Sequence, residues 1–186
     1  VLVYGILKLV NFAYGEYIMI AGYAIFLSAS TLHTPWYITL LIAVLAAVLV
    51  SYLTELIAFR PVRSQSPNAL IVTSFAVSVF LQNVVLIMVS PRARPVQLPF
   101  FFSRTIEIAG ATVPLRNLLV IAVTAVLLVA LSLLMKKTVV GMAMRAAADK
   151  FTTTRLMGVP ANLVISTAFV ISGLLAGVAS IFWVSR

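Results

Sequence analysis

Apolar runs long enough to cross a lipid bilayer recur along this chain, and they constrain its fold more than any other feature. A membrane-spanning helix needs about 20 mostly apolar residues. The sequence predicts such helices at roughly 17–33, 36–59, 70–90, 117–135 and 162–184, and residues 1–10 resemble the end of a sixth. We therefore expect a single all-α domain over residues 1–186, a polytopic transmembrane helix bundle with about five or six spanning helices.

The composition excludes a water-soluble fold. Hydrophobic residues make up 63% of the chain and charged residues only 9%, whereas a soluble domain is about half apolar and about a quarter charged. The net charge of +9 fits the orientation of a membrane protein better than binding to nucleic acid. The chain has no cysteine, and His33 is its one histidine, so we expect no disulfide, no metal site and no bound cofactor.

Both ends of the sequence interrupt apolar segments. The chain starts at Val1 without a methionine, and Arg186 comes soon after the apolar residues Ile181 to Val184. We therefore expect the chain to be a fragment that is incomplete at both ends.

The predicted loops differ in charge. Residues 60–69 and 136–161 fall on one side of the predicted topology and carry seven basic residues, whereas residues 91–116 fall on the other side and carry four. The positive-inside rule therefore places the first two loops in the cytoplasm. The 91–116 loop also contains TIEIAGATV, in which apolar and polar residues alternate around a glycine, and this pattern predicts a small β-hairpin.

The predicted 70–90 helix carries one polar stripe. Ser74, Ser78 and Gln82 recur at four-residue spacing, and Asn83 adjoins Gln82 near mid-span. Lipid offers no hydrogen-bond partners, so we expect Gln82 and Asn83 to point into the bundle. Hydrogen bonding between helices and the lining of a translocation path remain two open interpretations of the stripe.

A second polar segment lies near the start of the chain, where Asn11, Tyr14, Gly15 and Glu16 interrupt an apolar run. Irregular backbone at membrane depth occurs where it lines a cavity. A loop at the membrane surface with a solvated Glu16 would have the same composition, so both interpretations stay open. The residues expected to line a substrate path are Asn11, Phe12, Glu16, Ser74, Ser78, Gln82 and Asn83.

The last predicted helix carries a GxxxG pattern formed by Gly173 and Gly177, with Ser166 and Ser180 on the same face. Small residues at this spacing let two helix backbones approach closely. We therefore expect this face to pack against another helix.

Of the four acidic residues, only Glu16 is expected to lie within the membrane. Glu55 falls on the last turn of its helix, with Arg60 and Arg63 just beyond it, which favours a snorkelled ion pair at the membrane interface. A proton relay needs a chain of ionisable groups at depth, and the sequence has no GxxxxGK[ST] phosphate loop. Enzymatic catalysis and proton-driven transport are therefore both poorly supported.

Four short motifs occur in the order found in a known family. They are VNFAYGE at 10–16, RPVR at 60–63, SVFLQN at 78–83, and GMAMRA followed by LMGV at 141–146 and 156–159. They resemble the NFAHG, RPLR, SLFLQN and GRAMRA…LMGI motifs of branched-chain amino-acid ABC transporter permeases of the LivH type. Tyr14 stands where histidine is usual, and Met142 stands where a basic residue is common.

The resemblance implies a larger machine. Such permeases work with a second permease subunit, two cytoplasmic ATP-binding subunits and an extracytoplasmic solute-binding protein, in contact with membrane lipid. The 136–161 loop would be the segment that docks on the ATPase, where a solvated surface helix is the alternative. The expected coupling residues are Gly141, Met144, Arg145, Ala146, Ala147, Asp149, Lys150 and Gly158.

The expected function is that of a permease subunit of an ABC importer, which moves branched-chain amino acids or a similar small polar solute across the bacterial inner membrane by alternating access. ATP hydrolysis is expected in partner subunits.

Urea and short-amide permeases of the same superfamily look nearly identical at this level. A passive channel or facilitator and a structural membrane subunit are two further functions that stay open, although a channel has no need of an ATPase-docking helix. The sequence also leaves open the substrate identity, the missing helices and whether the permease pairs with itself.

Overall fold

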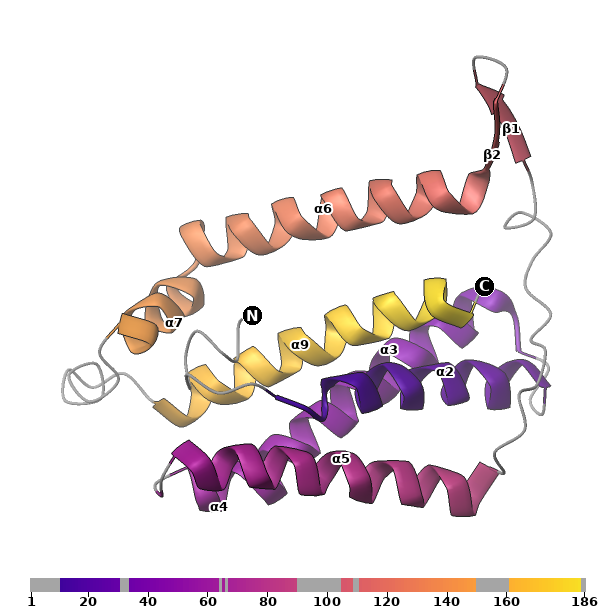
Figure 1. Ribbon diagram of the computed structural model, residues 1–186. Helices are drawn as coiled ribbons and strands as arrows, with labels where there is room; N and C mark the ends of the chain where they lie inside the picture. Colours follow the sequence, from indigo (N-terminus) through magenta and orange to yellow (C-terminus); the bar gives the residue numbers. More distant parts are fainter. Residues whose placement is uncertain are drawn as a thin grey trace.

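The computed structural model describes residues 11–30, 34–63, 65, 67–89, 105–108, 111–149 and 161–184. They form a bundle of long helices with one small hairpin (Figure 1). The elements are α2 (Tyr14–Ser30), α3 (Trp36–Thr54), the π-helical turn η1 (Glu55–Phe59), α4 (Arg60–Val62), α5 (Pro67–Val89), β1 (Thr105–Ile108), β2 (Ala111–Pro114), α6 (Leu115–Lys137), α7 (Val139–Asp149) and α9 (Ala161–Val184). The predicted helical bundle is confirmed, and the predicted helix end at residues 1–10 lies outside the described residues.

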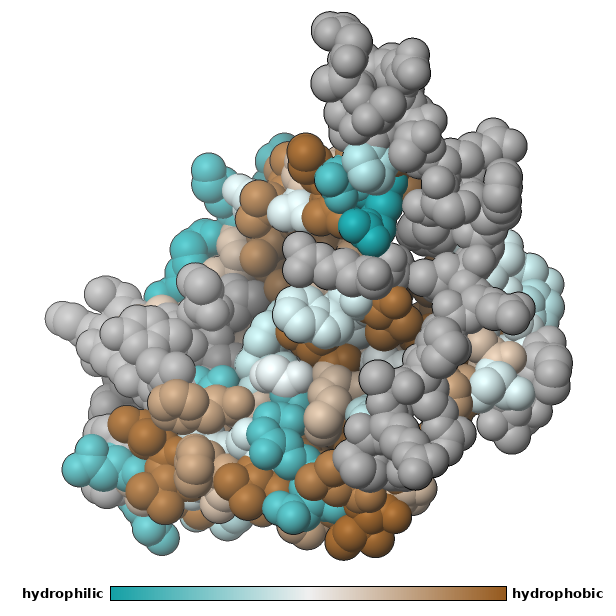
Figure 2. All heavy atoms as spheres, turned by 45° about the vertical axis from the view of Figure 1, so that its right-hand side comes forward, coloured by the Kyte–Doolittle hydropathy of each residue, from teal (hydrophilic) through white to brown (hydrophobic). Residues whose placement is uncertain are grey.

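Four helical stretches are long and apolar enough to cross a membrane. They are Trp36–Val62, Asn68–Val89, Leu115–Lys137 and Asn162–Val184. Helix α2 has 17 residues, which is the lower end of the range of about 17–25 residues that a span requires. Hydrophobic side chains are exposed along the lower rim of the molecule in Figure 2, where α5 lies, as expected of a surface that meets lipid or further helices.

The helix that begins at Trp36 is longer than the sequence predicts. The expected end lies at Phe59, but the helix continues through η1 and α4 to Val62. Pro61 has no N–H to donate to the preceding turn. In the wider π-helical turn just before it, the N–H of Arg60 bonds to the carbonyl of Glu55, so the helix passes the proline without ending.

Two glycines let α9 lie directly against α3. A Cβ added to Gly173 would come within 2.8 Å of the Ala47 carbonyl oxygen and of Val48 Cα, and one added to Gly177 would come within 2.7 Å of Val44 Cα. The predicted packing role of the GxxxG pattern is therefore confirmed. Because lipid tails are as apolar as leucine, close backbone contact of this kind holds membrane helices together where the hydrophobic effect does not.

Helix α2 completes a three-helix core with α3 and α9. Ala21 and Ile25 of α2 are buried with Ala43 and Ala47 of α3, and one turn earlier Tyr17 packs with Ala176 of α9 in a second buried cluster. Alanines at these contacts keep the helix axes close, in the same way as the glycines of α9.

The predicted hairpin in the 91–116 loop is confirmed. Strand β1 pairs antiparallel with β2, with Thr105 opposite Pro114 and Ile108 opposite Ala111. The hairpin leads directly into α6, none of whose residues is buried, and α6 runs apart from the three-helix core (Figure 1).

Candidate functional site

A buried carboxylate joins α2 to α5. Glu16 lies in the first turn of α2 and is only 8% exposed. Its Oε1 accepts a hydrogen bond of 2.8 Å from the hydroxyl of Ser78 and one of 2.7 Å from the amide Nε2 of Gln82. The structure thus brings the polar N-terminal segment and the polar stripe together, and we call these three residues the Glu16 cluster.

The Glu16 cluster lies at mid-depth in the bundle. Ser78 stands midway between the two ends of α5, which is one of the stretches able to cross a membrane. Helix α2 therefore begins beside the middle of a spanning helix, as Figure 1 shows. Only residues 11–13 of this segment are irregular, and the choice between membrane depth and membrane surface for them stays a prediction.

Asn11 and Tyr17 order the start of α2. The Oδ1 of Asn11 accepts a hydrogen bond of 3.0 Å from the backbone N–H of Ala13, which forms an Asx turn just before the helix. The Nδ2 of Asn11 lies 3.5 Å from the hydroxyl of the fully buried Tyr17. Phe12, which the sequence predicts to line a path, is 51% exposed. The sequence did not single out Tyr17, because a tyrosine in an apolar helix looks the same in a core and in a site.

The polar residues of α5 differ in their surroundings, and Gln82 is exposed although its amide reaches Glu16. Ser74 is fully buried. Asn83 is exposed, and its Nδ2 donates to the carbonyl of Val79 in its own helix at 2.7 Å. The prediction that Asn83 points into the bundle is therefore wrong, because successive residues on an α-helix project about 100° apart. Its place in a substrate path stays a prediction.

A second buried carboxylate joins η1 to α9. Glu55 is fully buried, and its Oε2 accepts a hydrogen bond of 2.8 Å from the hydroxyl of Ser166. Its Oε1 lies 3.8 Å from Nη1 of Arg63, and Nη2 of Arg63 donates to Oδ1 of Asn162. The expected ion pair with Arg63 is present. The Glu55 carboxylate is buried against α9 and does not reach solvent, whereas Arg60 is exposed. The depth of this pair in the membrane stays a prediction.

The two buried carboxylates differ in how their charge is balanced. Glu55 has a guanidinium beside it. Glu16 receives hydrogen bonds from a hydroxyl and an amide, and no ion pair to it forms within the part of the chain that the structure describes. Nor do three His, Cys, Asp or Glu side chains come close enough to hold a metal ion, within that same part.

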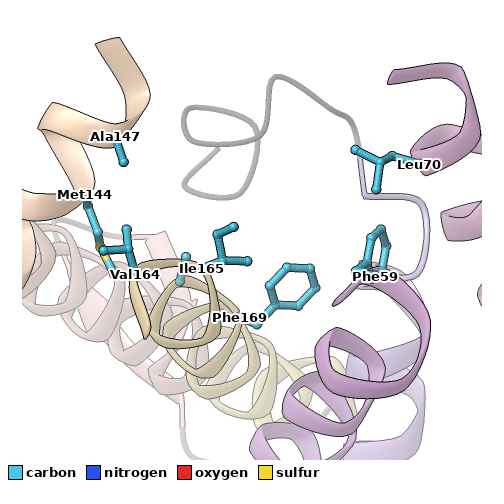
Figure 3. Packing of buried hydrophobic residues seen from close by; sticks show 8 residues of the cluster. Phe59, Leu70, Met144, Ala147, Val164, Ile165 and Phe169 are labelled. Atoms are coloured by element: carbon cyan, nitrogen blue, oxygen red, sulfur yellow. The ribbon is translucent and has the colours of Figure 1, made fainter. Parts of the chain in front are cut away.

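Helix α7 presents two different faces. Met144 is fully buried and Ala147 is 3% exposed, and both belong to a buried cluster with Val164 and Phe169 of α9 and Phe59 of η1 (Figure 3). The 3.6-residue period of the helix turns the intervening residues outward.

Only some of the predicted coupling residues lie on the exposed face of α7. Arg145 and Ala146 are exposed, whereas Gly141 is buried against the end of α6. The prediction that Ala147 lies at a partner's contact surface is wrong, because the chain's own α9 covers it. Lys150, Gly158 and the side chain of Asp149 lie outside the described residues.

The chain is similar in sequence to known membrane permeases. The family model described as "Branched-chain amino acid transport system / permease component" matches residues 1–186. The high-affinity branched-chain amino acid transport system permease protein BraD of Pseudomonas aeruginosa is 30% identical over 97% of the chain. The LivH proteins of Escherichia coli K12 and Salmonella typhimurium are 30% and 29% identical over the same share. The chain spans 62% of the length of each of these relatives. No solved structure matches the chain.

Proposed function

Because the chain belongs to the family of permease components of branched-chain amino acid transport systems, we propose that it forms part of the permease subunit of an ATP-binding-cassette importer. Its cargo would be a branched-chain amino acid or a similar small polar solute, carried across the bacterial inner membrane. The Glu16 cluster is the observation that carries this proposal. A carboxylate, a hydroxyl and an amide meet at mid-depth between two otherwise apolar helices, and polar side chains at that depth mark solute pathways.

The path would run along α2 and α5, and alternating access would change the separation of these two helices. Helix α9 is fixed to α3 by direct backbone contact at Gly173 and Gly177. The middle of α5 is joined to α2 through Ser78 and Gln82 of the Glu16 cluster. Most of the large hydrophobic side chains of α5 are exposed. The core of α3 and α9 would stay fixed while the more loosely attached α5 moves relative to it. Movement of this kind beside the Glu16 cluster suits transport by alternating access.

The exposed face of α7 would dock on a cytoplasmic ATP-binding subunit. Arg145 and Ala146 lie on this face, and the basic 60–69 and 136–161 loops indicate that it is cytoplasmic. The opposite face packs onto α9 through Met144 and Ala147. A displacement of α7 by the partner would therefore reach α9, and through the glycine contacts it would reach α3.

The remaining parts of the machine follow from this role. Two ATP-binding subunits would hydrolyse ATP, so that this chain itself would not be an enzyme. A second permease subunit and an extracytoplasmic solute-binding protein would complete the importer, and the binding protein would deliver the solute.

Transport by the full-length permease tests the proposal. We would reconstitute it in proteoliposomes with its ATP-binding subunits and its solute-binding protein, and measure uptake of radiolabelled leucine. Accumulation against a gradient is expected only with hydrolysable ATP. Equilibration of leucine without ATP would indicate a facilitator instead, and accumulation of urea but not of leucine would contradict the assignment of an amino-acid cargo.

A further inference from the structure

We propose that the carboxylate of Glu16 binds the ammonium group of the transported solute. The inference rests on the proposed function and deepens it, because it names the charge that a solute must carry to pass this site.

The charge balance around Glu16 is the first argument. Glu16 is 8% exposed and lies at mid-depth, where an ionised carboxylate is costly unless a cation or strong donors offset its charge. The two donors that reach it, Ser78 and Gln82, are both neutral. The described part of the chain therefore supplies hydrogen bonds to this carboxylate but no positive charge.

Glu55 provides the internal comparison. It is also buried, and its Oε1 lies 3.8 Å from the guanidinium of Arg63 while Ser166 donates to Oε2. The chain thus compensates one buried carboxylate with a basic side chain of its own. At Glu16 the ammonium group of a solute would fill the equivalent role.

The geometry of the donors leaves room for such a cation. Both hydrogen bonds end on Oε1 of Glu16, and Oε2 accepts none from the described residues. The bonds from Ser78 and Gln82 fix the carboxylate in place, so that it need not reorganise when a ligand binds.

The chain is exposed at the start of α2. Gly15 is exposed, and Phe12 is 51% exposed. A small solute can therefore approach the start of α2 from this side.

This arrangement would select between the candidate cargoes. An amino acid brings an ammonium group, which makes a charge-assisted hydrogen bond with a carboxylate. Urea and short amides are neutral and would leave the charge of Glu16 unbalanced. The contact between the Glu16 carboxylate and an ammonium group would therefore favour amino acids over neutral amides.

Two substitutions of Glu16 separate its charge from its shape. Glu16→Gln keeps the length and an acceptor oxygen for Ser78 and Gln82 but removes the charge. Glu16→Asp keeps the charge on a shorter side chain. In proteoliposomes with the full importer, we expect Glu16→Gln to lower leucine uptake by about tenfold or more, the scale of a hydrogen bond to a charged group, and Glu16→Asp to retain more uptake than Glu16→Gln.

The reverse order would overturn the proposal. If Glu16→Gln imports as well as the wild type, or better than Glu16→Asp, Glu16 acts only as a hydrogen-bond acceptor for Ser78 and Gln82 and its charge is not needed. If the wild-type importer accumulates leucine with ATP while this reversal holds, only the ammonium site fails and the proposed function stands. If the wild type accumulates no amino acid, both fail.

Glu16→Asp covers the case in which Glu16→Gln does not assemble. It keeps the negative charge, so we expect an assembled complex that still hydrolyses ATP and still imports leucine. An assembled Glu16→Asp complex that hydrolyses ATP but imports no leucine would overturn the proposal. So would a failure of both variants to assemble, because Glu16 would then be a structural residue.

Discussion

The hydroxyl of Ser166 in α9 donates a hydrogen bond of 2.8 Å to Oε2 of Glu55, at the far end of the helix that begins at Trp36. This bond, the hydrogen bond from Arg63 to Asn162 and the glycine contacts hold the helix that begins at Trp36 against α9 along much of its length. A buried carboxylate that depends on a hydroxyl from another helix gives a direct test of this attachment.

Ser166→Ala should destabilise the permease more than Thr167→Ala. The first substitution removes a hydrogen bond to a buried charged group, which is worth about 1.5–3 kcal/mol. Thr167 bonds only to carbonyls of its own helix, so its loss should have little effect. Thermal unfolding of the purified full-length complex would show the difference, and equal melting temperatures for the two variants would contradict the role of Ser166.

Gln82→Leu and Asn83→Leu should differ in transport. Gln82 donates to Glu16, and its removal leaves the carboxylate with one donor, so we expect uptake to fall by about tenfold, the scale of a lost hydrogen bond to a charge. Asn83 bonds to its own helix on the exposed side, and its replacement should leave uptake near the wild-type level. Initial rates of leucine uptake measure both effects, and a larger loss for Asn83→Leu would refute the orientation of α5.

Gly177→Leu should weaken the packing of α9 on α3. Its side chain would collide with the backbone at Val44, and overpacking of this kind costs about 1–3 kcal/mol or more. Ala179→Leu is the matched control, because Ala179 is exposed on the same helix. The expected result is a lower unfolding temperature for Gly177→Leu alone, whereas equal stability would mean that the two helices can separate freely.

Ala146→Trp and Ala147→Trp should fail in different ways. Ala146 is exposed, so a bulky side chain there should block the ATP-binding subunit while the permease stays folded, and Arg145→Glu should do the same by reversing a charge. Ala147 packs on α9, so Ala147→Trp should lower the stability of the permease itself. Co-purification of the ATP-binding subunit and thermal unfolding distinguish the two failures. Normal co-purification with Ala146→Trp and Arg145→Glu would show that α7 does not dock.

The sequence predicts the helices well because the apolar runs are local signals. The GxxxG face and the hairpin are of the same kind, since a few neighbouring residues determine each of them. Local signals also identified Glu16, Ser78 and Gln82, each within its own segment. Their meeting could not be predicted, because Glu16 and Ser78 are 62 residues apart.

Glu55 and Ala147 show where local reasoning ends. A glutamate near a helix end with arginines beyond it is typical of an interfacial ion pair, and only the position of α9 reveals that it is buried. Ala147 has the small side chain of a docking surface, yet the same property suits it to the close contact with α9. In both cases a distant helix decides the environment, and the sequence around the residue carries no record of it.

The length of the helix from Trp36 to Val62 has a consequence for the surrounding lipid. Its 27 residues extend about 40 Å at 1.5 Å per residue, whereas the hydrocarbon core of a bilayer is about 30 Å thick. With its headgroup regions, however, a bilayer is about 40–45 Å thick. Trp36 at one end and Arg60 near the other would then reach the headgroups, where aromatic and basic side chains are favoured. The length of this helix therefore suits a bilayer of ordinary thickness, and α3 crosses the bundle obliquely (Figure 1).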